Sequence, residues 1–209
     1  MKLTFVRHGE SEANVLHEIS NRGLKHPLTI HGQQQATDLA RALQGASFRH
    51  IFTSPILRAV QTAQTLTEAL RIPYEITDAL REYDCGILEG RTDAEAWQAF
   101  DALTESWLTR HDWEARIEQG ESFNDIRARF LPFIADLVAN NEATDNDILL
   151  VGHGGIYRCM LPLILKNVSH DFALAHPLRY TAAIIAEGTP SGLVCSSWSG
   201  INMLGNRRT

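Results

Sequence analysis

The sequence predicts an α/β protein of three layers, α/β/α, built on a mostly parallel sheet. Apolar segments of strand length alternate with amphipathic segments of helical length along most of the 209 residues. Such alternation is typical of a sheet with helices on both faces. The clearest buried strand is expected at Asp147–Gly155, with the sequence DILLVGHGG. We expect one domain over residues 1–209, with a small helical lid inserted at about 91–120.

The first third of the chain predicts three strands and two helices. A short buried strand is expected at Lys2–Arg7, and an amphipathic helix at His31–Gly45 that the glycine ends. A second strand covers Arg49–Pro55 and a third covers Ile72–Thr77. Between these two lies a helix that continues to Leu70.

This helix has a recognisable start. Ser54 is expected as its N-cap, because a serine hydroxyl accepts hydrogen bonds from the N–H groups of the first turn. Pro55 would then be the first helical residue, where its missing N–H costs nothing.

The second half predicts two helices and a hairpin. Glu121–Asn140 reads as a long helix, with Ser122 and Asp125 resembling a capping box and Pro132 predicting a kink. The strand at 147–155 leads into a helix through about residue 165, which Pro162 would distort near its end. Residues 182–188 and 192–199 predict two late strands, paired as a hairpin.

Residues 91–120 differ from the rest in composition. They contain three of the four tryptophans, Trp97, Trp107 and Trp113, together with seven acidic residues and only three arginines. We interpret this stretch as a mostly helical lid over the sheet, with the tryptophans forming a small core within it and one of them as a candidate to face the substrate.

Composition excludes several classes of protein. The net charge of −6 argues against a nucleic acid or an anionic membrane as the main partner. No apolar run approaches the roughly 20 residues that span a bilayer, and the first strand begins too early for an apolar signal segment. Cys85, Cys159 and Cys195 lack metal-type spacing, so we expect reduced thiols and a cytoplasmic protein. The oligomeric state stays open, with a homodimer as one option.

Reactive side chains gather where the predicted strands end. Ligands of open α/β sheets bind beyond the carboxyl ends of the strands. The residues expected there are Arg7 and His8, Ser54 with Arg58 one turn into the next helix, Arg81 and Glu82, and His153. Two arginines (Arg7 and Arg58), two histidines and one carboxylate would then share one crevice.

This set of side chains suits phosphoryl transfer. Two guanidinium groups bind phosphate oxygens bidentately and offset the charge that builds on them. A neutral histidine attacks phosphorus in line and forms a phosphohistidine, and a carboxylic acid gives the leaving alkoxide its proton. The second histidine can donate to a phosphoryl oxygen. Because the fixed cations do the work of a metal ion, we expect no metal and no other cofactor.

Six blocks in order resemble the histidine phosphatase superfamily, which has the phosphoglycerate-mutase-like fold. The blocks are VRHGESEAN, LTIHGQQQA, TSPILRAVQTA, LREYDCGILEG, GESFNDIRARF and LLVGHGG. The resemblance spans nearly the whole chain and is weakest across the lid and the last ten residues. A lone R-H-G is weak evidence, but six blocks at strand ends and helix starts are specific.

The resemblance implies a role for each site residue. It implies that His8 is the nucleophile, Glu82 the proton donor, and Arg7, Arg58 and His153 the phosphate pocket. The substrate would be a small phosphate monoester.

The resemblance also implies two further phosphate contacts, from Asn14 and from the backbone near Gly154. The match to T-S-P-x-x-R-A selects Arg58 for the pocket rather than Arg49 or Arg71.

Other reactive side chains have plainer interpretations. Asp84 and Glu89 are alternative acids, but the LRE block favours Glu82. Three basic residues after the first strand either contact substrate or form a solvated loop: Arg22, Lys25 and His26. Six histidines are expected at the surface or in structural roles: His17, His31, His50, His111, His170 and His176.

Three functions compete with a phosphatase. A cofactor-dependent phosphoglycerate mutase uses the same pocket but returns the phosphate to its product. A serine hydrolase is suggested by Gly9–Ala13, although this stretch lacks the last glycine of the nucleophile elbow. An inactive phospho-ligand module needs neither a nucleophile nor an acid, so His8, Glu82 and His153 together argue against it.

The lid favours hydrolysis over mutase activity. A mutase holds a doubly phosphorylated intermediate and needs cations opposite the nucleophile, whereas residues 91–120 carry a net charge of −4, from three arginines and seven acids. Like charges near a second phosphate weaken its binding. The mutases that the chain resembles also tend to have a longer insertion with adjacent arginines. We therefore expect water to accept the phosphate, and the physiological substrate to be decided by lid and loop side chains.

Overall fold

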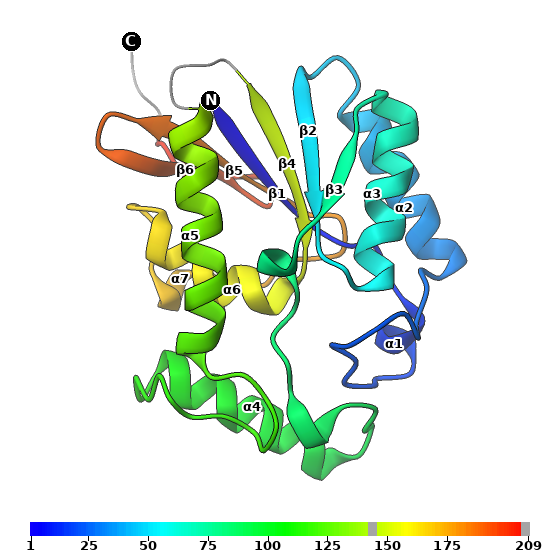
Figure 1. Ribbon diagram of the computed structural model, residues 1–209, viewed down its shortest axis with the longest axis vertical. Coiled ribbons are helices and arrows are strands. Elements are labelled where there is room, and N and C mark those ends of the chain that lie inside the picture. The colour runs from blue at the N-terminus through cyan, green and yellow to red at the C-terminus, as the bar shows by residue number, and fades with distance from the viewer. Residues whose placement is uncertain (142–145, 206–209) are drawn as a thin grey trace.

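The computed structural model describes residues 1–141 and 146–205 and contains a mixed sheet of seven strands. Their order across the sheet is β3-β2-β4-β1-β5-β6-β7 (Figure 1). The four parallel strands are β1 (Lys2–Arg7), β2 (Phe48–Thr53), β3 (Tyr74–Ile76) and β4 (Asp147–Gly152). The antiparallel strands beyond β1 are β5 (Ala183–Thr189), β6 (Gly192–Trp198) and β7 (Ile201–Asn202).

Helices cover both faces of this sheet. One face carries α2 (Ile30–Ala42) and α3 (Leu57–Leu70), and the other carries α5 (Phe123–Asn141) and α6 (Gly154–Ile164) (Figure 1). The remaining helices are α1 (Glu12–Val15), α4 (Ala94–Leu108) and α7 (His170–Ala175), with 3₁₀ turns at Asp78–Leu80 and Gly86–Leu88. The predicted α/β/α fold is confirmed.

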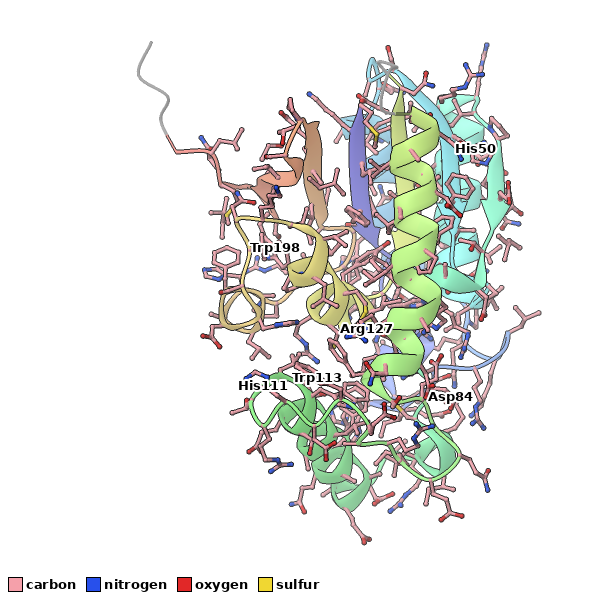
Figure 2. All side chains as sticks on the ribbon, turned by 60° about the vertical axis from the view of Figure 1, so that its left-hand side comes forward. His50, Asp84, His111, Trp113, Arg127 and Trp198 are labelled. Atoms are coloured by element: carbon pink, nitrogen blue, oxygen red, sulfur yellow. The ribbon has the colours of Figure 1, made fainter. Side chains whose placement is uncertain are left out.

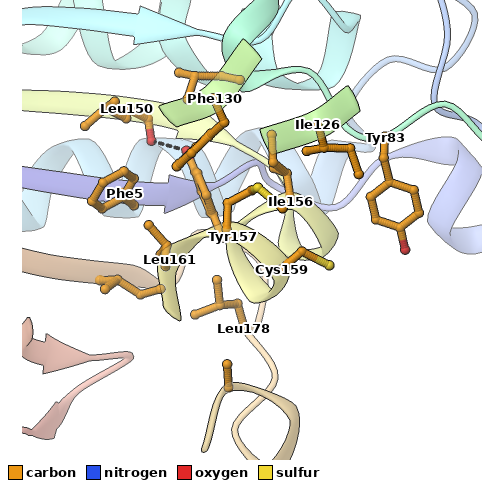
Figure 3. Packing of buried hydrophobic residues seen from close by; sticks show 14 of the residues in the cluster. Phe5, Tyr83, Ile126, Phe130, Leu150, Ile156, Tyr157, Cys159, Leu161 and Leu178 are labelled. Carbon is orange, nitrogen blue, oxygen red and sulfur yellow. Dashed lines mark hydrogen bonds between the residues drawn. The ribbon is translucent and has the colours of Figure 1, made fainter. Parts of the chain in front are cut away.

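The alternation of side chains along β4 explains why the layers form. Leu149 and Val151 are fully buried in an apolar cluster with α2 and α3. Ile148 and Leu150 point to the opposite cluster, with α5 and α6. Successive residues of a strand face opposite sides of a sheet, so a wholly apolar strand must be covered twice. On the α6 side, the Tyr157 hydroxyl also donates to the Leu150 carbonyl at 2.7 Å (Figure 3).

The start of α3 differs from the prediction. The helix begins at Leu57, with Ile56 as its N-cap, so Ser54 is not the N-cap and Pro55 lies before the helix. The Ser54 hydroxyl accepts the Ile56 N–H at 3.2 Å and is 2.7 Å from Nε2 of His153. The Ser54 hydroxyl is therefore engaged with His153 rather than in capping α3.

The other boundaries differ by a few residues. The capping box before α5 is confirmed: an Asp125 carboxylate oxygen accepts the N–H and hydroxyl of Ser122, and the Ser122 hydroxyl accepts the Asp125 N–H. The helix α5 runs on through Pro132, and Pro162 lies in the last turn of α6. Both α7 and β7 were missed by the sequence analysis.

The lid comprises α4 and an irregular return of the chain, at one end of the sheet (Figure 1). Trp107 of α4 is fully buried in the same apolar cluster as the sheet, and its indole N–H donates to the Ala115 carbonyl at 2.8 Å. Where the lid joins the body, Gly86 has a left-handed φ of +55° and packs on the backbone of Glu118 and Gly120. No helix in the described part of the chain is long and apolar enough to cross a bilayer.

Candidate active site

The parallel strands bring their carboxyl ends to one edge of the sheet. In the register of β1 with β4, Arg7 lies opposite Gly152. The His8 N–H donates to the Gly152 carbonyl at 3.0 Å, and the Ser54 N–H donates to the Val151 carbonyl at 3.0 Å. Backbone pairing therefore fixes the segments that follow β1, β2 and β4 beside one another.

His8 is held as a neutral imidazole in which Nε2 is the unprotonated nitrogen. Its Nδ1 lies 2.6 Å from the Gly9 carbonyl oxygen, which can only accept, so Nδ1 carries the ring proton. Nε2 is then the unprotonated nitrogen, and it accepts from Nε of Arg58 at 3.0 Å. Burial, followed by the charges of Arg58 and Arg7, holds the pKa of His8 well below its ordinary value.

A buried guanidinium group, of Arg58, and a partly buried one, of Arg7, flank this imidazole. Arg58 donates to the Ser20 carbonyl at 2.7 Å, and burial lowers its pKa to about 10. Arg7 donates to the Leu178 carbonyl at 2.6 Å and stacks on the ring of Tyr180, with its Cζ 4.3 Å from the ring centroid. The buried Nε of Arg7 has no hydrogen-bond partner among the described residues.

His153 lies behind His8, with 5.0 Å between the ring centroids. Its Nε2 is 2.7 Å from the Ser54 hydroxyl, whereas its buried Nδ1 has no partner in the described part of the protein. Burial, and then the nearby Arg58, His8 and Arg7, hold the pKa of His153 well below its ordinary value. Beside His8, one buried nitrogen of Arg7 and one of His153 thus lack a partner among the described residues.

Glu82 is a buried carboxyl held against the start of α6. Its oxygens accept the N–H groups of Gly155 at 2.9 Å, Ile156 at 2.7 Å and Tyr83 at 3.2 Å. These bonds favour the ionised form, but burial outweighs them and raises the pKa of Glu82.

The two alternative acids are bound elsewhere. Asp84 forms an ion pair with Arg22 at 2.7 Å, and Glu89 accepts backbone N–H groups of Asn21 and Arg22. Neither carboxylate lines the cavity beside His8, whereas Glu82 does.

A cavity of about 220 Å³ joins these groups. The predicted site residues that line it are Arg7, His8, Asn14, Arg58, Glu82 and Gly154. His153 does not line it, although the ring packs beside His8. The Asn14 side-chain oxygen accepts hydrogen bonds from the Ser11 N–H and hydroxyl. The amide nitrogen of Asn14 is therefore the group that remains to bind a ligand.

The other basic candidates form ion pairs with acidic residues and do not line the cavity. Arg81 binds Asp78 at 2.8 Å and Glu121 at 3.1 Å. Lys25 and His26 both bind Glu18, whose side chain is 9% exposed and lies at the cavity wall. The basic loop after β1 therefore neutralises an acid of the wall.

Sequence reasoning missed several residues of the cavity. Arg158 lies four residues after Gly154 on α6, and this helical spacing places both on one face, so the signal was available. Trp97 is the lid tryptophan that lines the cavity; the sequence allowed for one such residue but did not indicate which of the three it is. His176, expected at the surface or in a structural role, lines it too. Tyr180 precedes β5 in a turn that no motif marked.

Glycines let backbone segments meet around the nucleophile. A Cβ on Gly32 would lie 1.9 Å from the Glu10 carbonyl oxygen, and one on Gly9 would lie 2.5 Å from the Gly32 carbonyl oxygen. A Cβ on Gly155 would lie 2.7 Å from both carboxylate oxygens of Glu82. The R-H-G, I-H-G and G-H-G-G motifs therefore share one steric reason, the close approach of neighbouring segments.

Comparison with known proteins places this geometry in context. The family model of the histidine phosphatase superfamily (branch 1) matches residues 3–200. A probable phosphoglycerate mutase GpmB of Proteus mirabilis is 33% identical over 171 residues, which cover 79% of this chain and 75% of that protein. Human 6-phosphofructo-2-kinase/fructose-2,6-bisphosphatase 1 is 35% identical over 168 residues, 79% of this chain but only 33% of that protein. The crystal structure of a putative alpha-ribazole-5'-P phosphatase from Escherichia coli superposes with a TM-score of 0.77 and 25% identity, covering 95% of this chain and 96% of that one.

Proposed function

Because this chain belongs to branch 1 of the histidine phosphatase superfamily, we propose that it is a phosphomonoesterase that hydrolyses a small phosphorylated metabolite through a phosphohistidine on His8. The family predicted from the six sequence blocks is confirmed. The observation that carries the proposal is the state of His8: Nδ1 is protonated against Gly9, which leaves the lone pair on Nε2 at the cavity.

The proposed reaction has two steps. In the first, the Nε2 lone pair of His8 attacks phosphorus, the ester P–O bond breaks, and the leaving oxygen takes the proton of Glu82. In the second, the Glu82 carboxylate takes a proton from water, whose oxygen attacks the phosphohistidine. The P–N bond then breaks, inorganic phosphate leaves, and His8 and Glu82 return to their starting states.

The phosphoryl group would be held by the unpartnered donors. A phosphate oxygen accepts more strongly than an imidazole, so Arg58 would turn from Nε2 to the phosphate and free the lone pair. Arg7 offers its unpartnered Nε. The Ser54 hydroxyl accepts a hydrogen bond from the Ile56 N–H and can donate a hydrogen bond to Nε2 of His153. Nδ1 of His153 would then carry the ring proton, and this N–H would donate a hydrogen bond to a phosphoryl oxygen.

Two further donors complete the proposed pocket. Asn14 lines the cavity and has its amide nitrogen left to donate, and Gly154 begins α6, where the first N–H groups have no partner within the helix. Together with the guanidinium groups, these donors supply the positive field that a metal ion provides in other phosphoryl-transfer enzymes. We therefore propose a metal-independent mechanism of the acid phosphatase type.

The lid supports hydrolysis rather than mutase activity. Its three arginines each pair with an acid: Arg91 with Asp93 at 2.7 Å, Arg110 with Glu105 at 3.5 Å, and Arg116 with Asp125 at 3.0 Å. The lid residues that line the cavity are Trp97 and Phe100, so no lid cation among the described residues faces a second phosphate.

A direct assay separates these two activities. The enzyme is given 3-phosphoglycerate with catalytic 2,3-bisphosphoglycerate, and 2-phosphoglycerate is followed against inorganic phosphate. We expect hydrolysis to exceed isomerisation. Isomerisation that outruns hydrolysis would overturn the proposal in favour of a mutase.

We also propose that the protein works in the cytoplasm on a free phosphate monoester. The support is that Cys85, Cys159 and Cys195 are all unpaired thiols. Unpaired buried thiols are typical of a reducing compartment.

A further inference from the structure

The cavity has an apolar part between the lid and the segment before β5. It is formed by lid residues on α4 and by residues of α7, β6 and the connection that leads to β5. We call this set the apolar subsite: Trp97, Phe100, Ala173, Pro177, Leu178 and Trp198. In Figure 2 the lid lies below α7 and the labelled Trp198. The phosphate-binding groups and this subsite share one cavity, so the subsite is available to the alcohol half of the substrate.

The indole nitrogens of the subsite are already bonded within the protein. The Trp97 N–H donates to the His17 carbonyl at 2.9 Å, and the Trp198 N–H donates to the His176 carbonyl at 2.9 Å. The partly buried Trp97 ring therefore presents apolar surface to a ligand, whereas the Trp198 ring is fully buried and supports the wall.

Most neighbouring polar side chains of the wall are occupied as well. The Glu18 carboxylate is bound by Lys25 and His26, and the Asn21 amide donates to the Tyr83 carbonyl at 2.9 Å. The exception is Arg158, whose Nε has no partner among the described residues.

The size of the cavity limits what the subsite can hold. An apolar cavity of roughly 150 Å³ in another protein accommodates benzene. A cavity of about 220 Å³ that also takes the phosphoryl group therefore leaves space for one ring. A larger alcohol would extend past the lid into solvent.

The lid side of the subsite is built before substrate arrives. The Trp97 ring lies 4.3 Å from the ring of His17 and 5.3 Å from that of Phe100, measured between centroids. Phe100 is in turn stacked on Tyr83 at 5.6 Å, next in sequence to Glu82. A wall that is already ordered loses little entropy on binding, so its contacts contribute fully to recognition.

We propose that the substrate is a phosphate monoester whose alcohol carries an uncharged, ring-sized apolar group close to the ester oxygen, and that Trp97 and Phe100 select it. This inference rests on the proposed phosphatase activity and adds the substrate class.

The test compares kcat/KM for three primary alkyl phosphates: benzyl phosphate, glycerol 1-phosphate and 4-carboxybenzyl phosphate. We expect benzyl phosphate to be preferred over glycerol 1-phosphate by roughly 10- to 100-fold, the usual discrimination by apolar pockets. Trp97→Ala should remove at least about tenfold of this preference. It should lower kcat/KM for benzyl phosphate by a much larger factor than kcat/KM for glycerol 1-phosphate or the affinity for inorganic phosphate. Trp97→Leu, which keeps an apolar side chain, should give an intermediate preference and serves if Trp97→Ala does not fold.

The matched control is Trp113→Ala. Trp113 is also a half-buried lid tryptophan, but it packs on Phe123 and His111 and does not line the cavity. This variant should keep the preference for benzyl phosphate.

The other results would overturn the inference. Equal use of benzyl and glycerol phosphates, or a preference that survives in Trp97→Ala, would remove the apolar subsite from recognition. A preference for 4-carboxybenzyl phosphate would show that the alcohol is anionic, with Arg158 as its partner. The proposed function itself fails in a different way, if none of the three esters is hydrolysed and no phosphate is found on His8.

Discussion

The phosphate-binding end of the cavity and the lid are built in opposite ways. At the phosphate end, buried groups are fixed by backbone bonds, such as the His8 N–H to Gly152 and the Gly155 N–H to Glu82. In the lid, charged residues pair on an exposed surface, as Arg91 does with Asp93. The difference teaches that the proposed reaction and the proposed selection of the alcohol would rest on separate parts of the fold. The reaction would depend on the strand ends, and selection on the cavity wall that α4 and the segment before β5 form.

The strongest test of this division is His8→Ala. We expect hydrolysis to be abolished for every substrate, because no other side chain can form the covalent intermediate. Acid-quenched enzyme given labelled substrate should carry phosphate on His8 in the wild type and none in the variant. Label on a serine, or full activity in His8→Ala, would break the assignment of chemistry to the strand ends.

Glu82→Gln should have the next largest effect. Loss of a general acid costs about 10²- to 10⁴-fold, so turnover of alkyl phosphates should fall by that order. The loss should be much smaller for p-nitrophenyl phosphate, whose leaving group hardly needs a proton. Equal losses on both substrates would move the acid role to another carboxyl, of which Asp84 is the first to examine.

Trp107→Ala tests the lid as a structural unit. Trp107 is fully buried, so its truncation should lower the free energy of unfolding by about 3–5 kcal/mol. The remaining folded enzyme should keep its inhibition constant for inorganic phosphate, because the strand ends are untouched. Urea denaturation measures the free energy of unfolding. A weakened affinity for phosphate in the folded variant would show that the lid also supports the phosphate end.

The pH profile should reflect the phosphate end alone. The lowered pKa of His8 keeps this nucleophile neutral to a pH below the ordinary histidine range. The raised pKa of Glu82 keeps the acid protonated to a higher pH than an exposed glutamate. Above the pKa of Glu82, kcat/KM should fall about tenfold per pH unit. With an alkyl phosphate, this basic limb should be absent from the residual activity of Glu82→Gln and unchanged in Trp113→Ala.

The smallest expected effect is that of a chelator. Arg7 and Arg58 supply positive charge at the phosphate, so dialysis against EDTA should leave kcat/KM within experimental error. Restoration of lost activity by magnesium or zinc would contradict the proposed pocket.

The sequence predicted which residues meet at the phosphate end, because reactive side chains directly follow the apolar runs of the strands. Arg7 and His8 follow an apolar run, and His153 follows another. In a parallel sheet, such ends must meet. The same reasoning failed at Ser54, because its position before a proline equally suits a helix cap, and only the fold shows that His153 lies within reach of its hydroxyl.

The lid and the turn before β5 were beyond this reasoning. The composition of residues 91–120 indicates a lid, but not which tryptophan turns toward the cavity; Trp97 lines the cavity and Trp107 is fully buried in the core. Tyr180 stacks on Arg7 from a turn in which Thr181 has a φ of +56°, a conformation that its sequence does not favour. Contacts between segments far apart in the chain fixed these positions.

The close approach of Gly9 and Gly32 has a consequence for protein engineering. Alanine is a better helix former than glycine by about 1 kcal/mol, so Gly32 near the start of α2 would be a natural site for a stabilising substitution. Here the added methyl group would meet the Glu10 carbonyl oxygen at 1.9 Å, two residues beyond His8. The same clash would displace the nucleophile's loop and lower the melting temperature, so a substitution chosen from helix propensity alone would lose both stability and catalysis at this position.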